Sequence, residues 1–94
     1  MVPTSTYLHN ALDAAMNHPW AIARRAERDN HATTQCRSIT TRLVGAHGQD
    51  YVVDVVFEYW TPNTSVNNDD IVVRTRVNHQ TGMAQAVAWH VTHI

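Results

Sequence analysis

The stretch YVVDVVFEYW, residues 51–60, decides the fold of this chain. Its odd-numbered residues are all apolar or aromatic, whereas Asp54 and Glu58 interrupt the even-numbered set. Because successive side chains of a β-strand point to opposite faces, this period of two predicts a strand with one buried face and one half-solvated face. The branched and aromatic side chains also suit a pleated surface.

A helix is predicted ahead of this strand, over about residues 4–18. Its apolar residues recur at the spacing of one helix face. They are Leu8, Ala11, Leu12, Ala15 and Met16. Thr4 or Ser5 is the expected cap. Pro19 ends this helix, because it lacks an N–H and disfavours helical geometry at His18.

Pro19 also suits the first position of a second, shorter helix over about residues 19–28. The residues of this helix that are available for burial are Trp20, Ile22, Ala23 and Ala26. Arg24, Arg25 and Arg28 cluster on this helix, with Glu27 and Asp29 among them.

Period-two alternation predicts four strands, over about residues 35–44, 50–60, 71–78 and 83–93. Residues 45–48 and 79–82 are expected turns, the latter with Gly82 in the left-handed region. A three-residue loop closed by Gly82 places Thr75 opposite Val87 and Val73 opposite Trp89, and the first hairpin places Leu43 opposite Tyr51.

These elements predict an α+β fold in a single domain, residues 1–94. One or two N-terminal helices pack on one face of a four-stranded antiparallel β-meander. Leu8, Leu12, Met16 and Trp20 are expected to cover its apolar face. Residues 61–70 form a long polar connection between the second and third strands.

The opposite, outer face of the sheet is the predicted contact surface for a protein partner. Its expected residues are Val52, Asp54, Val56, Glu58, Trp60, Arg74, Arg76, Ala86, Ala88 and His90, with Arg42, Val72 and Ala84 beside them. Small residues would leave this face flat, and Arg and Trp are enriched at interface hot spots. A solvated face with Asp54 and Glu58 paired to Arg74 and Arg76 is the alternative.

The charge, hydropathy and cysteine content of the chain argue against several classes of function. The net charge of −1 gives no broad field for nucleic acid or anionic lipid. No apolar run is long enough to span a bilayer, the N-terminus lacks a signal-peptide pattern, and the single Cys36 is consistent with a reducing compartment. A cytoplasmic protein without membrane contact is therefore expected.

No catalytic, cofactor or metal site is predicted. The seven histidines show no zinc-type spacing, and His90 and His93 would point to opposite faces of one strand. Cys36 is expected on the outer face beside Glu58, whose carboxylate disfavours a reactive thiolate.

The leading hypothesis is a non-enzymatic protein-binding module. It would be a small inhibitor or regulator, for example one encoded by a phage or mobile element, that forms a homodimer or docks on a larger complex. The outer face and the 61–70 loop would form its contact surface.

One alternative is a nucleic-acid-binding accessory protein that uses Arg24, Arg25 and Arg28 together with Arg74 and Arg76. Another is a small enzyme or ligand carrier with a pocket between helix and sheet, lined by Tyr51, Tyr59, Trp89 and Met16.

Overall fold

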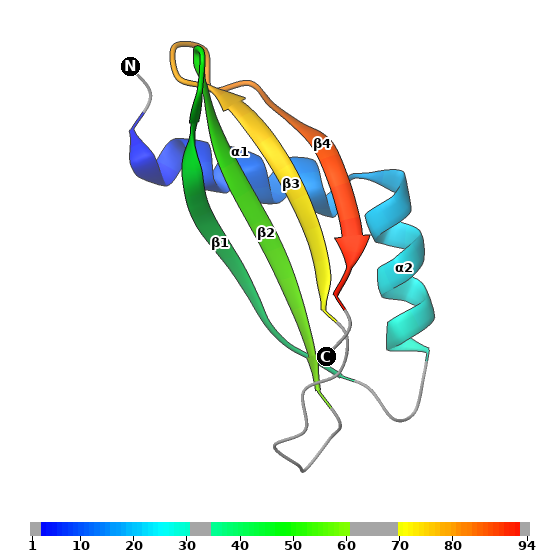
Figure 1. Cartoon of the computed structure of the whole chain (residues 1–94). Helices are drawn as coiled ribbons and strands as arrows, with labels where there is room; N and C mark the ends of the chain where they lie inside the picture. The colour runs from blue at the N-terminus through cyan, green and yellow to red at the C-terminus, as the bar shows by residue number, and fades with distance from the viewer. Residues whose placement is uncertain (1–2, 31–34, 61–69, 93–94) are drawn as a thin grey trace.

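A computed structural model describes residues 3–30, 35–60 and 70–92. The elements follow in the order α1 (Thr4–Met16), α2 (Pro19–Asp29), β1 (Gln35–His47), β2 (Asp50–Trp60), β3 (Ile71–Asn78) and β4 (Ala84–Val91). The strands form one antiparallel sheet in the order β1-β2-β3-β4. The predicted α+β meander is confirmed. Figure 1 shows α1 crossing behind the sheet and α2 lying beside β4.

The buried face of the sheet is the one that alternation predicts. Along β2 the fully buried odd-numbered side chains are Val53, Val55, Phe57 and Tyr59. β3 continues this face with Ile71, Val73, Thr75 and Val77. The two strands pair so that Val55 lies opposite Val73. Thr75 is the polar member of this face, and its hydroxyl donates a 2.8 Å hydrogen bond to the carbonyl of Val53.

α1 packs on this inner face with the residues that the sequence predicts. Leu8, Leu12 and Met16 are partly buried and pack against the core, as does Trp20 of α2. Ala11 and Ala15 are fully buried. A methyl group lets a helix approach a sheet more closely than a leucine side chain does, so Ala11 and Ala15 lie at the closest approach of α1 to the strands.

Two further contacts fix the position of α1 across the strands. The ring of Tyr7 stacks on Tyr51 of β2 with centroids 4.5 Å apart. The side-chain amide of Asn10 donates a 2.8 Å hydrogen bond to the carbonyl of Gly82, in the β3–β4 turn. The helix begins after Pro3 without a side-chain cap, so the predicted cap at Thr4 or Ser5 is wrong.

α2 begins at Pro19, as predicted, but buries a different face. Ala21 is its buried apolar residue, whereas Ile22 is half-exposed. Arg25 and Arg28 also turn toward the sheet, with their guanidinium carbons 4.7 Å from the Phe57 ring and 5.6 Å from the Tyr59 ring. The long aliphatic stems of arginine let these residues cover apolar surface where the sequence predicted alanine and isoleucine.

The first hairpin is tighter than predicted. His47 lies opposite Asp50, so only Gly48 and Gln49 form the turn, and Gly48 adopts a positive φ of 61°. Together with the shift in pairing between Leu43 and Gly45, this turn places Leu43 opposite Val53 and not opposite Tyr51. The pairing shifts between Cys36 and Ser38 and again between Leu43 and Gly45.

The second hairpin contains a bulge that the sequence did not reveal. Near the turn, where Gly82 has a φ of 76°, Val77 pairs with Ala84 and Thr75 with Ala86. Beyond the irregularity, Val73 pairs with Trp89 as predicted. Val87 is the extra residue, so the predicted Thr75–Val87 pair is wrong.

Truncating the inner face should be costly. Phe57→Ala removes a fully buried ring and is expected to lower the free energy of unfolding by about 3–5 kcal/mol. Denaturant unfolding followed by circular dichroism measures this. Met83→Ala is the matched control, because Met83 is exposed and should change stability little. Equal effects from the two variants would contradict the assigned faces.

Candidate functional site

The candidate site is the outer face of the sheet, defined by the even-numbered residues of β2 and β3 and their neighbours on β1 and β4. Figure 1 views the sheet from this side, with α1 behind it. Pairing across the strands aligns Val52 with Arg76, Asp54 with Arg74 and Val56 with Val72. On β4, Ala88 lies opposite Arg74 and His90 opposite Val72. Glu58 and Trp60 continue the face along β2, and Trp60 lies 5.0 Å from the guanidinium carbon of Arg37.

Ala84 and Ala86 do not belong to this face, although the sequence predicted them there. The bulge at Val87 reverses the alternation of β4, so Ala84 and Ala86 follow Val77 and Thr75 to the inner side and pack against the core. Residues 61–69, which were expected to extend the contact surface as a loop, lie outside the described residues.

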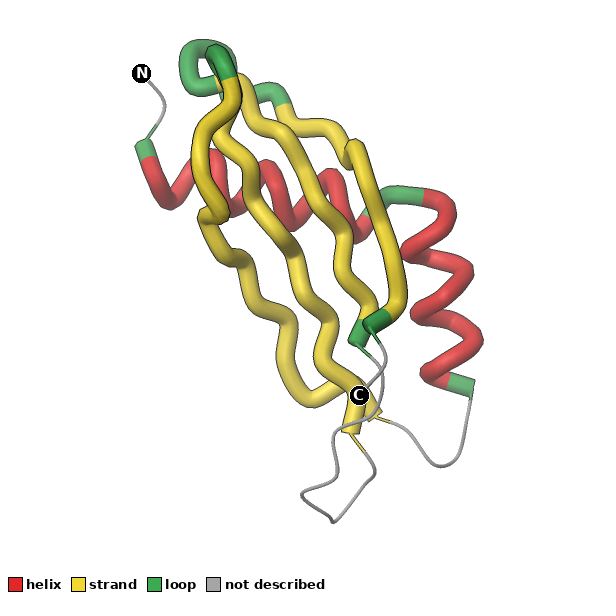
Figure 2. Tube along the Cα trace, in the orientation of Figure 1, coloured by secondary structure: helices red, strands yellow, loops and turns green. Residues whose placement is uncertain are grey.

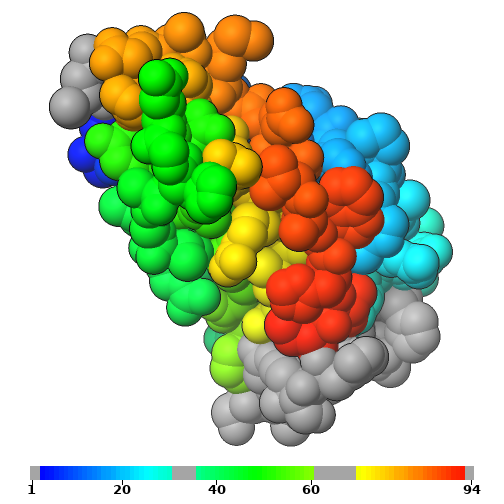
Figure 3. Space-filling view, turned by 45° about the horizontal axis from the view of Figure 1, so that its top comes forward, coloured from blue at the N-terminus to red at the C-terminus, as the bar shows by residue number. Residues whose placement is uncertain are grey.

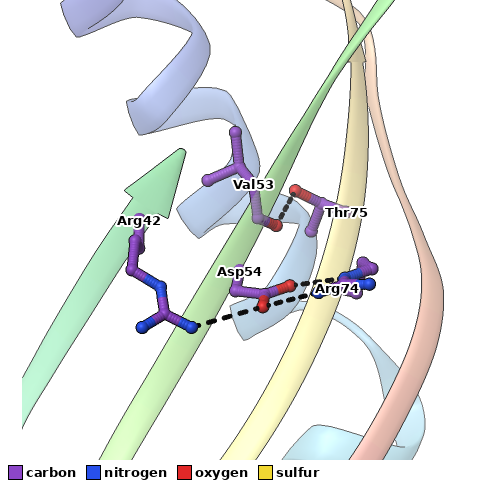
Figure 4. A network of polar contacts seen from close by, with 5 residues as sticks. All are labelled: Arg42, Val53, Asp54, Arg74 and Thr75. Carbon is purple, nitrogen blue, oxygen red and sulfur yellow. Dashed lines mark hydrogen bonds and ion pairs between the residues drawn. The ribbon is translucent and has the colours of Figure 1, made fainter. Parts of the chain in front are cut away.

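A buried carboxylate organises the centre of the outer face. Asp54 has a side chain only 6% exposed and accepts two hydrogen bonds from Arg74, from Nε at 2.8 Å and from Nη2 at 3.0 Å. Arg42 approaches the same carboxylate from β1, with Nη2 3.9 Å from Oδ2. Figure 4 shows Asp54 between the two arginines. The register causes this arrangement, because Arg42, Asp54 and Arg74 are direct neighbours on three successive strands.

The two arginines bind this carboxylate unequally. Arg74 holds it in a bidentate, charge-assisted geometry, which is the strong form of the interaction. The hydrogen bonds and charge of Asp54 raise the pKa of the Arg74 guanidinium. Arg42 is 74% exposed and makes only the longer contact, so its donors remain available to another acceptor.

A second ion pair lies toward the β1–β2 turn. Arg76 Nε is 3.1 Å from Asp50 Oδ2, and Arg76 Nη2 is 2.9 Å from His47 Nδ1. A guanidinium can only donate, so His47 Nδ1 is the acceptor in this contact. The side chain of Asp54 is much less exposed than that of Arg74, at 6% against 47%, whereas Asp50 and Arg76 are similarly exposed, at 28% and 36%.

The outer face is not flat, which corrects the prediction. A hollow of about 470 Å³ lies where this face meets the β3–β4 turn. The even-numbered strand residues Asp50, Arg76 and Asn78 line it together with Gln85, as do Thr81, Met83, Ala84 and Val87 from the turn and β4. A second hollow of about 320 Å³ is lined by Thr40, Arg42, Val56, Glu58, Asp70, Val72 and Thr92. The row formed by Arg42, Asp54 and Arg74 lies between them. Figure 3 shows this uneven surface over β2, β3 and β4.

The helix arginines do not form one basic patch. Arg24 is exposed and pairs with Glu27 at 2.9 Å, whereas Arg25 and Arg28 turn beneath the sheet onto aromatic rings. A phosphate backbone needs several cations accessible from one side. This geometry therefore weakens the nucleic-acid alternative that the sequence left open.

The four residues expected to line a ligand pocket are separated in the structure. Tyr59 is fully buried, and Tyr51 stacks on Tyr7 under α1. Trp89 lies on the edge strand β4, where its ring contacts His18 with centroids 4.2 Å apart. Met16 packs at the margin of the core. These side chains do not converge on a common cavity.

Cys36 lies on the inner side, opposite Tyr59, and not beside Glu58 as predicted. The shift in pairing between Cys36 and Ser38 causes this, because it makes Ser38 the neighbour of Glu58. Burial raises the pKa of the Cys36 thiol, the Arg25 guanidinium opposes that rise, and the Asp29 carboxylate adds to it. Within the described residues, no three His, Cys, Asp or Glu side chains are grouped closely enough to hold a metal ion.

Comparison with known proteins identifies no relative. No protein-family model matches the chain, and neither the curated proteins nor the solved structures contain a significant match. Of the helices in the described part of the chain, neither is both long enough and apolar enough to cross a bilayer.

The unequal pairing of Asp54 can be measured by double-mutant cycles. The coupling free energy between Asp54 and Arg74, from Asp54→Asn and Arg74→Gln, is expected to be about 1–3 kcal/mol, because the pair is bidentate and its carboxylate is buried. The coupling between Asp54 and Arg42 should stay below about 0.5 kcal/mol, since Arg42 is exposed. Equal couplings would show that the carboxylate is shared evenly.

The raised thiol pKa predicts slow modification of Cys36. At about pH 8, Ellman's reagent should react more slowly with the folded chain than with the chain in denaturant, because less thiolate is present. Asp29→Asn should speed the reaction by removing a charge that disfavours thiolate. Asp13→Asn on α1 is the matched control and should leave the rate unchanged. A folded rate equal to the denatured rate would contradict this environment for Cys36.

Proposed function

We propose that the protein is a non-enzymatic protein-binding module whose contact surface is the outer sheet face. One observation carries the proposal: the side chains of Arg42 and Arg74 are 74% and 47% exposed, while the side chain of Asp54 between them is 6% exposed. Solvent therefore meets guanidinium groups although the face contains acidic residues. A partner that approaches this face meets guanidinium hydrogen-bond donors that the sheet already holds in position.

The chemistry of this surface suits a partner segment that carries carboxylates. Asp54 holds Arg74 in one conformation, so less side-chain entropy is lost on binding than for a free arginine. Arg42 retains donors for a bidentate contact. Ala88, exposed beside Arg74, leaves room for a partner to approach the sheet.

The two hollows support the same interpretation. Each is large enough to receive one or more partner side chains, and they flank the charged row on both sides. Interface hot spots combine arginine contacts with side chains seated in pockets. The hollow beside Glu58 and Asp70 is lined by acidic residues as well as Arg42, so the face distinguishes one orientation of a charged partner from the reverse.

A module of this kind acts by covering a surface of its partner. We therefore propose a regulator or inhibitor, for example one encoded by a phage or mobile element, that works in the cytoplasm and docks on a larger protein. His90 and Trp60 lie on the same face and would extend the contact toward the far end of β2.

The proposal is tested by affinity capture with the tagged full chain, followed by mass identification of the partner and measurement of its affinity. Arg42→Ala and Ala88→Trp should each weaken binding at least tenfold, the first by removing a donor and the second by blocking approach to the sheet. Arg24→Ala, an exposed arginine on α2, is the matched control and should bind like the unaltered chain.

Two results would overturn the proposal. In the first, Arg24→Ala abolishes capture while the outer-face variants bind normally. In the second, a labelled oligonucleotide binds with a strong salt dependence that Arg24→Ala removes, which would favour the nucleic-acid alternative.

A further inference from the structure

β1 is an open edge of the sheet. It pairs with β2 on one side, and Figure 2 shows no other described element running along its opposite side. A strand at the edge of a sheet presents unpaired backbone N–H and C=O groups that can pair with a further strand. Between its two shifts in pairing, β1 is regular from Ser38 to Leu43.

The other edge, β4, is less suited to pairing. Its alternation is broken at Val87. The junction between α1 and α2 also packs beside it, where Trp89 contacts the rings of His18 and Trp20. Bulges and flanking elements are the usual means of protecting an edge strand.

β1 also leaves apolar side chains exposed on the inner side of the sheet. Ile39 and Leu43 pair with Phe57 and Val53, which are fully buried, yet they are 39% and 47% exposed themselves. A neighbour beyond the free edge of β1 would cover both side chains.

We infer that β1 pairs with β1 of a second copy of this chain, antiparallel and centred on Thr41. This inference concerns a surface other than the outer face and goes beyond the proposed function. A two-fold axis perpendicular to the sheet at Thr41 places Ile39 opposite Leu43 of the second copy, and Leu43 opposite its Ile39. The paired segment, residues 39–43, fits between the two irregularities of β1.

A second copy fits this edge because the strand is complementary to itself in this register. Arg42 is the only charged residue of the regular segment, and it faces the neutral Thr40 of the second copy. No like charges lie directly opposite each other, which is the arrangement that antiparallel pairs favour. A register centred on Thr40 would instead place Ile39 against Thr41, with less apolar contact.

Cysteine cross-linking tests both the pairing and its register. In a Cys36→Ser background, Thr41→Cys places two thiols directly opposite each other, at a Cα separation of about 4.5–5.5 Å, which a disulfide can bridge. Thr40→Cys is the matched control, because its two copies would be diagonal neighbours about 7–8 Å apart. Under mild oxidation the Thr41→Cys chain should form a covalent dimer and the Thr40→Cys chain should not.

The mass of the unmodified chain, measured by light scattering over a concentration series, should rise to that of a dimer. Leu43→Asp should abolish the dimer, whereas Val87→Asp, at a 41% exposed position on the other edge, should keep it. Circular dichroism confirms that each variant is folded. A monomer at every concentration, or cross-linking through Thr40→Cys in preference to Thr41→Cys, overturns the inference. Neither result affects binding measured at Arg42 and Ala88.

Discussion

The contact of Ala11 and Ala15 on α1 with the inner face of β2 and β3 determines which face of the sheet points to solvent. Ala11 and Ala15 are fully buried against a sheet face whose valines, Val53 and Val55, are fully buried too. A strand has only two faces, so burying the odd-numbered residues of β2 forces Asp54 and its even-numbered neighbours outward. A shift by one residue would place that carboxylate beneath the helix without a partner.

The charged row of the outer face follows from the same constraint. Asp54 is flanked on both neighbouring strands by arginines in register, and the bidentate contact with Arg74 compensates the burial of its charge. The consequence is a surface on which the acidic group is hidden and the basic groups remain accessible. The docking function that we propose for this face depends on this difference in exposure rather than on the net charge of the chain.

Much of this architecture is predictable from the sequence, because the alternation over residues 51–60 and 71–78 identifies strands and their buried faces without further information. The outward placement of Asp54, Arg74 and His90 followed directly. The errors came from features that alternation does not encode. The irregularities of β1 and the bulge at Val87 each insert a residue, and one inserted residue turned Ala86 from the predicted contact surface into the core.

The helices were less predictable for a related physical reason. The apolar face of α1 was predicted correctly, but hydrophobicity does not show that its fully buried members are Ala11 and Ala15 while Leu8, Leu12 and Met16 are only partly buried. On α2, Arg25 and Arg28 turn toward the sheet in place of the predicted Ile22 and Ala26, because their guanidinium groups lie over the rings of Phe57 and Tyr59. The positions of apolar residues alone do not show which side chains of α1 are fully buried or that arginines of α2 contact the sheet.

Nuclear Overhauser spectroscopy on isotope-labelled protein tests the central placement of α1 most directly. This placement predicts cross-peaks between the ring protons of Tyr7 and Tyr51, and between the side-chain amide of Asn10 and the α-protons of Gly82. Cross-peaks from the Ala11 and Ala15 methyls to Val56 or Val72, in place of the inner-face valines, would contradict it. They would show that the helix covers the face assigned here to solvent and to a partner.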